Sequence, residues 1–168
     1  MEQFLRTELL LGKENLNKLF NAKVIVIGLG AVGSFATEML ARLGIGNITL
    51  VDFDKVQISN INRQLYALHS TVGRTKVSLA KERVSDINPL CKVKTLELFA
   101  NTDTFEKIFK EKTDIVIDAI DSYNPKLRLI EYCYKNKIKI VSSMGAALKT
   151  DPFLIKYADL FDTHHCKL

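Results

Sequence analysis

Short, uninterrupted apolar runs recur along the chain and alternate with segments of helical periodicity. Continuous runs of Val, Ile and Leu are typical of parallel strands that are buried on both faces of a sheet. Five such strands are expected, at residues 24–28, 48–52, 93–99, 114–120 and 138–144. Because the runs are continuous rather than alternating, helices must cover both faces of the predicted sheet.

Between these runs, apolar residues recur three and four positions apart, which predicts helices. The clearest stripe comprises Val32, Phe35, Ala36, Met39, Leu40 and Leu43. A second comprises Val77, Ala80, Val84 and Ile87, and Asn88-Pro89 stops it. Further helices are expected at residues 127–134 and, shorter, at 105–109. Alternating strands and helices predict a doubly wound α/β fold, with a mostly parallel, Rossmann-like sheet.

The 168 residues, 47% of them hydrophobic, suit one globular domain with a sizeable core. A helical leader is expected within residues 1–22, before a nucleotide-binding core at 23–144. Residues 145–168 are interpreted as the start of a C-terminal part that is truncated, and 153–157 are a candidate sixth strand. The leader needs a purpose, because a plain dinucleotide-binding domain usually starts at its first strand.

Composition narrows the class of protein. The apolar runs are shorter than the roughly 20 residues of a membrane span, and the N-terminus does not resemble a signal peptide. Three separated cysteines without a Cys-x-x-Cys pair disfavour structural zinc and indicate a reducing cytoplasm. The adjacent His164, His165 and Cys166 are not expected to share a metal ion, because their side chains diverge. A net charge of +5 suits either a nucleic-acid partner or a solvated lysine-rich surface.

A glycine-rich loop, Gly28-Leu-Gly30-Ala31-Val32-Gly33, leaves the first predicted strand and enters a helix. In that context the motif predicts a phosphate-binding turn at a helix N-terminus, rather than a turn without a ligand. Asp52 ends the second strand, where an acid reaches ribose hydroxyls in NAD and ATP sites alike. These residues therefore leave an NAD(P)-dependent oxidoreductase open.

Three later residues favour ATP. Attack on the α-phosphorus of a triphosphate requires cations, which neutralise charge on the phosphoryl group and on departing pyrophosphate. Arg63 and Lys76 are the candidate cations, and Asp121, just past the fourth strand, is a candidate Mg²⁺ ligand. Each also has a plain interpretation, since the two bases could be solvated surface charges and Asp121 could cap a helix. Asn60 and Asn62 could similarly be turn formers.

The combined pattern resembles the ubiquitin-activating-type adenylyltransferases, a superfamily that includes ThiF-, MoeB- and HesA-like proteins. The matching elements are Gly28-x-Gly30-x-x-Gly33, Asp52-x-Asp54, Asn60-x-x-Arg63-Gln64, Lys76, Asp121 and the leader segment Arg6-Thr-Glu-Leu-Leu-Leu-Gly12. The resemblance implies that Asp52 holds the ribose and that Arg6, Arg63 and Lys76 bind phosphates. It further implies that Asp121 binds Mg²⁺, that Asn60 and Gln64 support the site, and that Arg6 reaches the ATP of the other subunit of a homodimer.

Within that superfamily, the tRNA threonylcarbamoyladenosine dehydratases are the most similar branch. The matching segments include Ile45-Gly-Asn-Ile-Thr-Leu-Val-Asp-Phe-Asp and Ile117-Asp-Ala-Ile-Asp-Ser. The resemblance implies that ATP activates the carboxylate of a threonylcarbamoyl group on a tRNA adenosine, and that an internal nitrogen closes a ring with loss of water. Members of this branch are longer than the present chain, so its activity at this length is in doubt.

Three other functions remain open. An adenylase for a ubiquitin-like sulfur carrier would commonly contain two Cys-x-x-Cys pairs, and this chain has none. An NAD(P)-dependent oxidoreductase and a non-catalytic nucleotide-binding partner are the others. Five basic residues against the single acid Glu131 suit a tRNA substrate better than a protein tail: Lys126, Arg128, Lys135, Lys137 and Lys139. A sulfur-relay protein is a further candidate partner.

Overall fold

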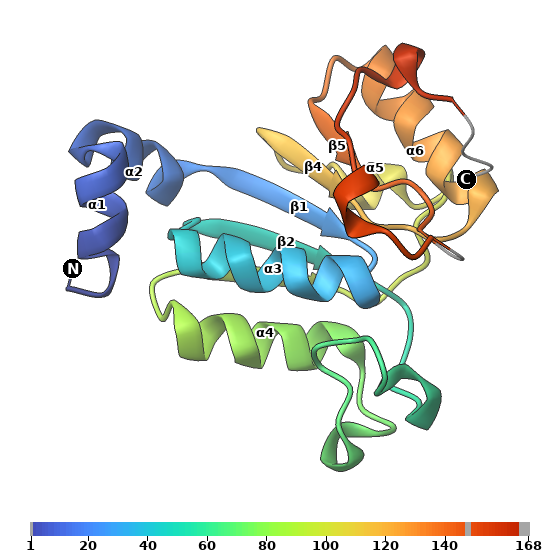
Figure 1. Cartoon of the computed structure of the whole chain (residues 1–168), viewed down its shortest axis with the longest axis horizontal. Coiled ribbons are helices and arrows are strands. Elements are labelled where there is room, and N and C mark those ends of the chain that lie inside the picture. Colours follow the sequence, from blue (N-terminus) through green and yellow to red (C-terminus); the bar gives the residue numbers. More distant parts are fainter. Residues whose placement is uncertain (1, 147–148, 165–168) are drawn as a thin grey trace.

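The computed structural model describes residues 2–146 and 149–164. Its centre is a five-stranded sheet in the order β3-β2-β1-β4-β5, in which every neighbouring pair is parallel (Figure 1). The strands are β1 (Lys23–Ile27), β2 (Asn47–Val51), β3 (Lys92–Leu96), β4 (Ile115–Asp118) and β5 (Ile140–Ser142). The predicted doubly wound α/β fold is confirmed.

Helices cover both faces of the sheet. α3 (Ala31–Leu43) and α4 (Lys76–Ile87) pack on one face, against Val24 and Val26 of β1. α5 (Phe105–Ile108) and α6 (Tyr123–Lys135) pack on the other, against Ile25 and Ile27. Successive side chains of a strand point to opposite faces, so the continuous apolar run of β1 feeds two separate cores.

The order of the strands reverses beside β1. From β1 the chain adds β2 and β3 on one side, and then crosses over to add β4 and β5 on the other. In open parallel sheets such a reversal opens a crevice outside the carboxyl ends of the strands. The residues that directly follow β1, β2 and β4 therefore converge on one edge of the sheet.

The leader is helical but broken. A 3₁₀ turn (η1, Glu2–Phe4) precedes α1 (Leu5–Leu11) and α2 (Lys13–Asn21), which are separated by Gly12. Gly12 adopts φ 80°, a left-handed value that interrupts a helix and that glycine tolerates well. Phe4 is buried, and its ring contacts that of Phe20 edge-on at 5.3 Å. α1 extends beyond the amino-terminal ends of β1 and β2, at the edge opposite the crevice (Figure 1).

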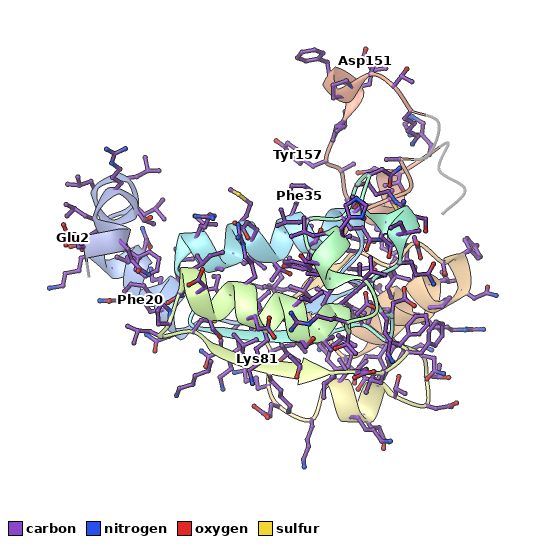
Figure 2. The ribbon with its side chains drawn as sticks, turned by 90° about the horizontal axis from the view of Figure 1, so that it is seen from below. Glu2, Phe20, Phe35, Lys81, Asp151 and Tyr157 are labelled. Carbon is purple, nitrogen blue, oxygen red and sulfur yellow. The ribbon has the colours of Figure 1, made fainter. Side chains whose placement is uncertain are left out.

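The apolar stripe of α3 faces outward. Val32, Phe35, Met39 and Leu43 are 40–59% exposed, and Figure 2 shows Phe35 at the surface of the molecule. The inward face of α3 instead consists of small and polar residues: Gly33, Ser34, Thr37, Glu38 and Ala41. Of the stripe predicted from the sequence, Leu40 packs against the core, whereas most of the other members face away from the sheet.

In the described residues, the segment between β2 and α4 contains short 3₁₀ turns and one isolated antiparallel bridge, between Lys55 and Thr75, and the segment after β5 contains only short 3₁₀ turns. The 3₁₀ turns are η2 (Ile58–Asn60), η3 (His69–Thr71), η4 (Pro152–Leu154) and η5 (Leu160–Asp162). The candidate sixth strand at 153–157 is wrong. The Asp151 carboxylate accepts the N–H of Phe153 and closes a turn, and Pro152 has no N–H to offer a neighbouring strand.

The strand boundaries also differ from the predictions: β1 and β2 by one residue, and β3, β4 and β5 by more, with β4 ending at Asp118 rather than 120. β3 ends at Leu96 rather than 99, and β5 spans three residues rather than seven. Strand pairing sets both limits, because β3 pairs only with the five residues of β2 and β5 only with the end of β4. Within the ranges that the structure describes, no helix has the length and hydrophobicity to cross a membrane.

An ion-pair cluster joins α3 to α4. The carboxylate of Glu38 accepts hydrogen bonds from Arg83 at 2.9 Å through both Nε and Nη2, and from Nε of Arg42 at 2.8 Å. The hydrogen bonds from Arg83, followed by those from Arg42, lower the pKa of the Glu38 carboxyl below its ordinary value, although partial burial opposes them. The ionised form of Glu38 therefore stabilises the folded chain.

We expect Glu38→Gln to lower the free energy of unfolding at pH 7 by about 1 kcal/mol, because its arginine partners are half exposed. A pKa that folding lowers contributes stability above the unfolded value of 4.5, and that stability is lost as the pH falls through the folded value. The difference between wild type and variant in urea denaturation should therefore shrink below pH 4.5. Glu131→Gln, which removes two exposed ion pairs, is the control. A difference that stays constant down to pH 3 would contradict this account.

Candidate functional site

A cavity of about 550 Å³ lies at the carboxyl ends of the strands. Seven segments line it, and most of them follow a strand or begin a helix. The lining residues that the sequence singled out are Gly28, Gly30, Ala31, Val32, Asp52, Asp54, Asn60, Arg63, Gln64, Lys76 and Asp121. The reversal of strand order thus brings together residues that are separated by almost a hundred positions.

The glycine-rich loop forms the floor of this cavity through close backbone contacts. Gly28 has φ 88°, and a Cβ atom there would lie 2.7 Å from the carbonyl oxygen of Ala119. Gly33 lies beneath the loop, where a Cβ would lie 1.7 Å from the Gly28 carbonyl oxygen. α3 begins at Ala31, so its unpaired N–H groups and the positive end of its dipole lie beside the cavity.

Asp52 joins the loop to the end of β2. Its Oδ2 accepts the Leu29 N–H at 2.6 Å and its Oδ1 accepts the Asp54 N–H at 2.8 Å. Burial raises the pKa of the Asp52 carboxyl above its ordinary value, although the two N–H groups and Lys76 oppose that change. A carboxylate in this position can accept further hydrogen bonds from hydroxyl groups of a ligand.

Lys76 is the first residue of α4 and extends from the helix terminus to the cavity. Its Nζ lies 2.8 Å from Oδ2 of Asp54, and its side chain is 6% exposed. Its N–H also donates to the Asp54 carbonyl oxygen at 3.0 Å. Thr75 is the N-cap residue of α4, but its side chain makes no capping hydrogen bond.

Asn60 ends the 3₁₀ turn η2, and Arg63 and Gln64 follow it. Asn60 Oδ1 accepts the Gln57 N–H at 3.0 Å, so this residue both forms a turn and lines the cavity. Arg63 is exposed, and its Nη1 donates to the Ser59 carbonyl oxygen and to Oδ1 of Asn62. Gln64 is buried, and its Nε2 would lie 3.6 Å from a Cβ on Gly30.

Asp121 is exposed in the loop between β4 and α6. Ser122, not Asp121, is the N-cap of α6, and the Ser122 hydroxyl is the one donor to the Asp121 carboxylate in the part of the chain that the structure describes, at 3.4 Å. Capping of α6 therefore does not account for Asp121. Its carboxylate is available to a ligand in the cavity.

Lys126 is not a surface charge, contrary to its place in the predicted basic cluster. It is 1% exposed, and its Nζ lies 2.7 Å from Oδ2 of Asp118, which is fully buried. The other members of that cluster, Arg128, Lys135, Lys137 and Lys139, are exposed. Arg128 and Lys135 both pair with Glu131, which reduces the local excess of positive charge.

An apolar wall of the cavity escaped the sequence analysis. Phe53 and Phe99 contact each other edge-on at 5.0 Å, and Leu98 and Ala100 lie beside them. A usable signal existed, because Phe53 lies between two cavity-lining aspartates and Phe99 follows β3 at the same edge of the sheet. The segment 143–146, which follows β5, was missed in the same way.

Arg6 does not line the cavity. It belongs to α1, at the opposite edge of the sheet, and is exposed (Figure 1). No group of three or more potential metal-ligating His, Cys, Asp or Glu side chains occurs in residues 2–146 and 149–164. Burial raises the pKa of both the Cys91 and Cys133 thiols to about 11, so neither is a ready nucleophile at neutral pH. His165 and Cys166 lie outside the described residues.

Comparison with protein families identifies the class of this domain. The model of the ThiF family matches residues 4–166, which is nearly the whole chain. The chain belongs to the ThiF family. This result agrees with the resemblance to ThiF-like proteins that was predicted from the pattern including Gly28, Asp52 and Asp121.

Curated relatives give a finer comparison. The chain is 52% identical, over 164 residues, to a Bacillus subtilis protein named tRNA threonylcarbamoyladenosine dehydratase. The match covers 98% of this chain and 65% of that protein. A molybdopterin-synthase adenylyltransferase of Salmonella typhimurium is 33% identical over 138 residues, which are 82% of this chain and 54% of that one. The chain thus spans less than two thirds of the length of these relatives.

Solved structures agree with both the fold and the family. The crystal structure of the E. coli tRNA N6-threonylcarbamoyladenosine dehydratase in complex with ATP matches with a TM-score of 0.96 and 42% identity. The match covers 99% of this chain and 69% of that chain. A complex of the same E. coli protein with AMP matches equally well.

Proposed function

We propose that this chain is the ATP-binding part of an enzyme that removes water from threonylcarbamoyladenosine in tRNA and thereby cyclises it. The observation that carries the proposal is the convergence of Asp52, Arg63, Lys76 and Asp121 on one cavity. The relatives named as dehydratases of this tRNA base, and the ATP and AMP complexes of the E. coli protein, support it.

The proposed chemistry has two steps. A carboxylate oxygen of the modified base attacks the α-phosphorus of ATP, a P–O bond forms, and the bond to pyrophosphate breaks. A nitrogen of the same modified base then attacks the activated carbonyl carbon, and AMP leaves with the former carboxylate oxygen. The nitrogen loses its proton, so the base has lost the elements of water while ATP has become AMP and pyrophosphate.

In the proposed function, different walls of the cavity bind different parts of ATP. Asp52 is positioned to accept hydrogen bonds from the ribose hydroxyls, and the apolar wall beside Phe53 and Phe99 offers a surface for a purine. The phosphates then lie toward the N-terminus of α3 and Lys76. Arg63 and Lys76 would stabilise the charge that develops on the attacked phosphoryl group and on pyrophosphate.

Asp121 is the residue best suited to hold Mg²⁺. Magnesium commonly uses one or two carboxylates together with phosphate oxygens and water, so a dedicated cluster of protein ligands is not needed. The exposed Asp121 carboxylate lines the cavity and accepts only the distant Ser122 hydroxyl in the described residues. Bound there, the ion would neutralise charge on the triphosphate.

A homodimer would explain two features that a monomer leaves without a purpose. The apolar stripe of α3 is exposed, and contiguous exposed apolar surface is typical of protein interfaces. Arg6 lies at the edge of the sheet opposite the cavity of its own chain (Figure 1). In the proposed homodimer, the outer face of α3 contacts the second copy and Arg6 approaches the nucleotide of that copy.

Activation of a sulfur-carrier protein is the main alternative, because the Salmonella relative is named as an adenylyltransferase of molybdopterin synthase. The adenylation step would be the same, and only the carboxylate that attacks ATP would differ. The higher identity to the dehydratases, 52% against 33%, favours the tRNA base.

The direct test supplies ATP, Mg²⁺ and tRNA that contains threonylcarbamoyladenosine, and measures the nucleoside by mass spectrometry. We expect the mass of the modified base to fall by one water, with AMP and pyrophosphate as products. Lys76→Ala should abolish the change, and tRNA without the modification is the substrate control. Nucleotide binding is measured separately with ATP and NAD. Tight binding of NAD without binding of ATP would contradict the proposal at its first step.

For Asp121 we expect that Asp121→Ala removes most of the gain in ATP affinity that Mg²⁺ gives, about tenfold or more, because the ion loses its protein ligand. Isothermal titration with ATP, with and without Mg²⁺, measures the effect. Asp103→Ala, in an exposed turn before α5, is the matched control. An unchanged response to Mg²⁺ in the Asp121 variant would show that the ion is held elsewhere.

For the homodimer we expect Phe35→Glu to yield a monomer in sedimentation, because a charge would be buried in the proposed interface. Leu90→Glu, at an exposed position outside α3, should leave the assembly unchanged. Mixing Arg6→Ala with Lys76→Ala tests action across subunits. Mixed dimers would contain one intact site, so equal mixing should restore activity to about a quarter of wild type. Failure of the mixture to regain activity, with mixed dimers present, would place Arg6 outside the partner's site.

A further inference from the structure

A buried ion pair behind the cavity has no part in the steps proposed above. Lys126, in the first turns of α6, and Asp118, the last residue of β4, are 1% and 0% exposed. We propose that this pair is a positioning device, which fixes the Asp121 loop and the segment 143–146 at the rim of the cavity. The inference rests on the role proposed for Asp121, and it assigns Lys126 as the residue that holds that carboxylate in place.

The ammonium group of Lys126 has a hydrogen-bond acceptor for each of its donors. Its three N–H donors have three acceptors: Asp118 Oδ2 at 2.7 Å, Ser142 Oγ at 3.2 Å and the Ser143 carbonyl oxygen at 2.9 Å. Ser142 in turn donates its hydroxyl to Asp118 Oδ2 at 2.6 Å. Lys126 therefore joins α6 to the carboxyl ends of both β4 and β5.

The network reaches the cavity through the backbone. Oδ1 of Asp118 accepts the N–H of Ile120 at 3.0 Å, which fixes the residue directly before Asp121. The Asp118 carbonyl oxygen accepts the N–H of Ser143 at 2.9 Å, and residues 143–146 line the cavity. Both loops that leave β4 and β5 are thus held by groups of Asp118.

The same loop also contacts the phosphate-binding turn. A Cβ on Gly28 would lie 2.7 Å from the Ala119 carbonyl oxygen and 2.9 Å from the Ala119 carbonyl carbon. No side chain separates these two backbones, so a displacement of residues 119–121 would displace the Gly28 turn as well. The position of Asp118 is therefore relevant to the phosphates as well as to Mg²⁺.

A contribution to the stability of the fold does not by itself explain why a buried ion pair occurs here. Removing two charges from water costs about as much as their attraction returns, and apolar replacements of similar volume are often neutral or stabilising. What apolar side chains could not provide is an acceptor for the Ile120 N–H and a donor to the Ser143 carbonyl. The pair therefore contributes a defined geometry at the rim of the cavity.

The test uses a double variant that removes both charges, Asp118→Leu/Lys126→Met, so that neither is left buried alone. The matched control is Lys94→Met/Glu111→Leu, which removes an exposed ion pair between β3 and the segment after α5. Three quantities are measured: unfolding in urea, hydrogen exchange of the segments 119–122 and 143–146, and ATP affinity with and without Mg²⁺.

We expect the Asp118/Lys126 double variant to fold with near wild-type stability and to exchange faster in both segments. Its affinity for ATP in the presence of Mg²⁺ should fall about tenfold, as is usual when a partner that orients a metal ligand is removed. Affinity without Mg²⁺ should fall less. Lys126→Arg, which keeps a charge for Asp118, should retain part of the Mg²⁺ response, and the control should match wild type in every measurement.

Wild-type exchange in residues 119–122, or wild-type affinity for ATP with Mg²⁺ despite faster exchange, would overturn the positioning role. If the double variant does not fold, the pair is structural and the proposal is wrong. If instead the role proposed for Asp121 is wrong, the ATP affinity of Asp121→Ala would keep its response to Mg²⁺. Hydrogen exchange at Ile120 in the Asp118/Lys126 double variant would still show whether Lys126 holds the loop.

Discussion

A parallel sheet covered on both faces leaves its polar groups one principal place to gather, the edge where the strands end. Every strand of this sheet runs in the same direction, so the residues after β1, β2 and β4 meet there. The reversal of strand order beside β1 opens the crevice, and Gly28 and Asp52 enter it from neighbouring strands. The hydrogen bond from the Leu29 N–H to Asp52 then joins the two strand ends. The site follows from this geometry before any particular side chain is considered.

Features that depend on signals local in the sequence could be predicted, whereas features that depend on the partner of a side chain could not. Asp52 and the glycine loop were predictable, because a strand end and a helix start are local signals and the parallel arrangement brings them together. Lys126 was not, because counting charges along a segment says nothing of their partners, and a buried acid eight residues earlier removes this lysine from the surface. The strand predicted at residues 153–157 was wrong because a local signal was overlooked. Their apolar run is real, but the Asp151-Pro152 turn before them is the stronger local signal.

Two lysine–aspartate pairs beside the same cavity differ in what surrounds them. Lys76 pairs with Asp54, whose side chain is 46% exposed, so a phosphate arriving in the cavity can compete for the ammonium group. Lys126 pairs with an Asp118 that nothing in solvent can reach. In the proposed function, the first pair would hold a cation beside the phosphates, and exchanging one anionic partner for another would require little reorganisation. The second cannot exchange partners, which makes it suitable as a fixed support.

α3 has the reverse of the usual arrangement of a surface helix. Its buried face is polar and pairs Glu38 with Arg83, whereas its apolar face, including Phe35 and Met39, is exposed. Such a face forms a hydrophobic core only when a second surface packs against it. If a second copy supplies that surface, part of the folding free energy is intermolecular, and mass action governs it. The melting temperature of the protein would then rise with its concentration, and dilution alone would destabilise α3, the helix that follows the glycine-rich turn.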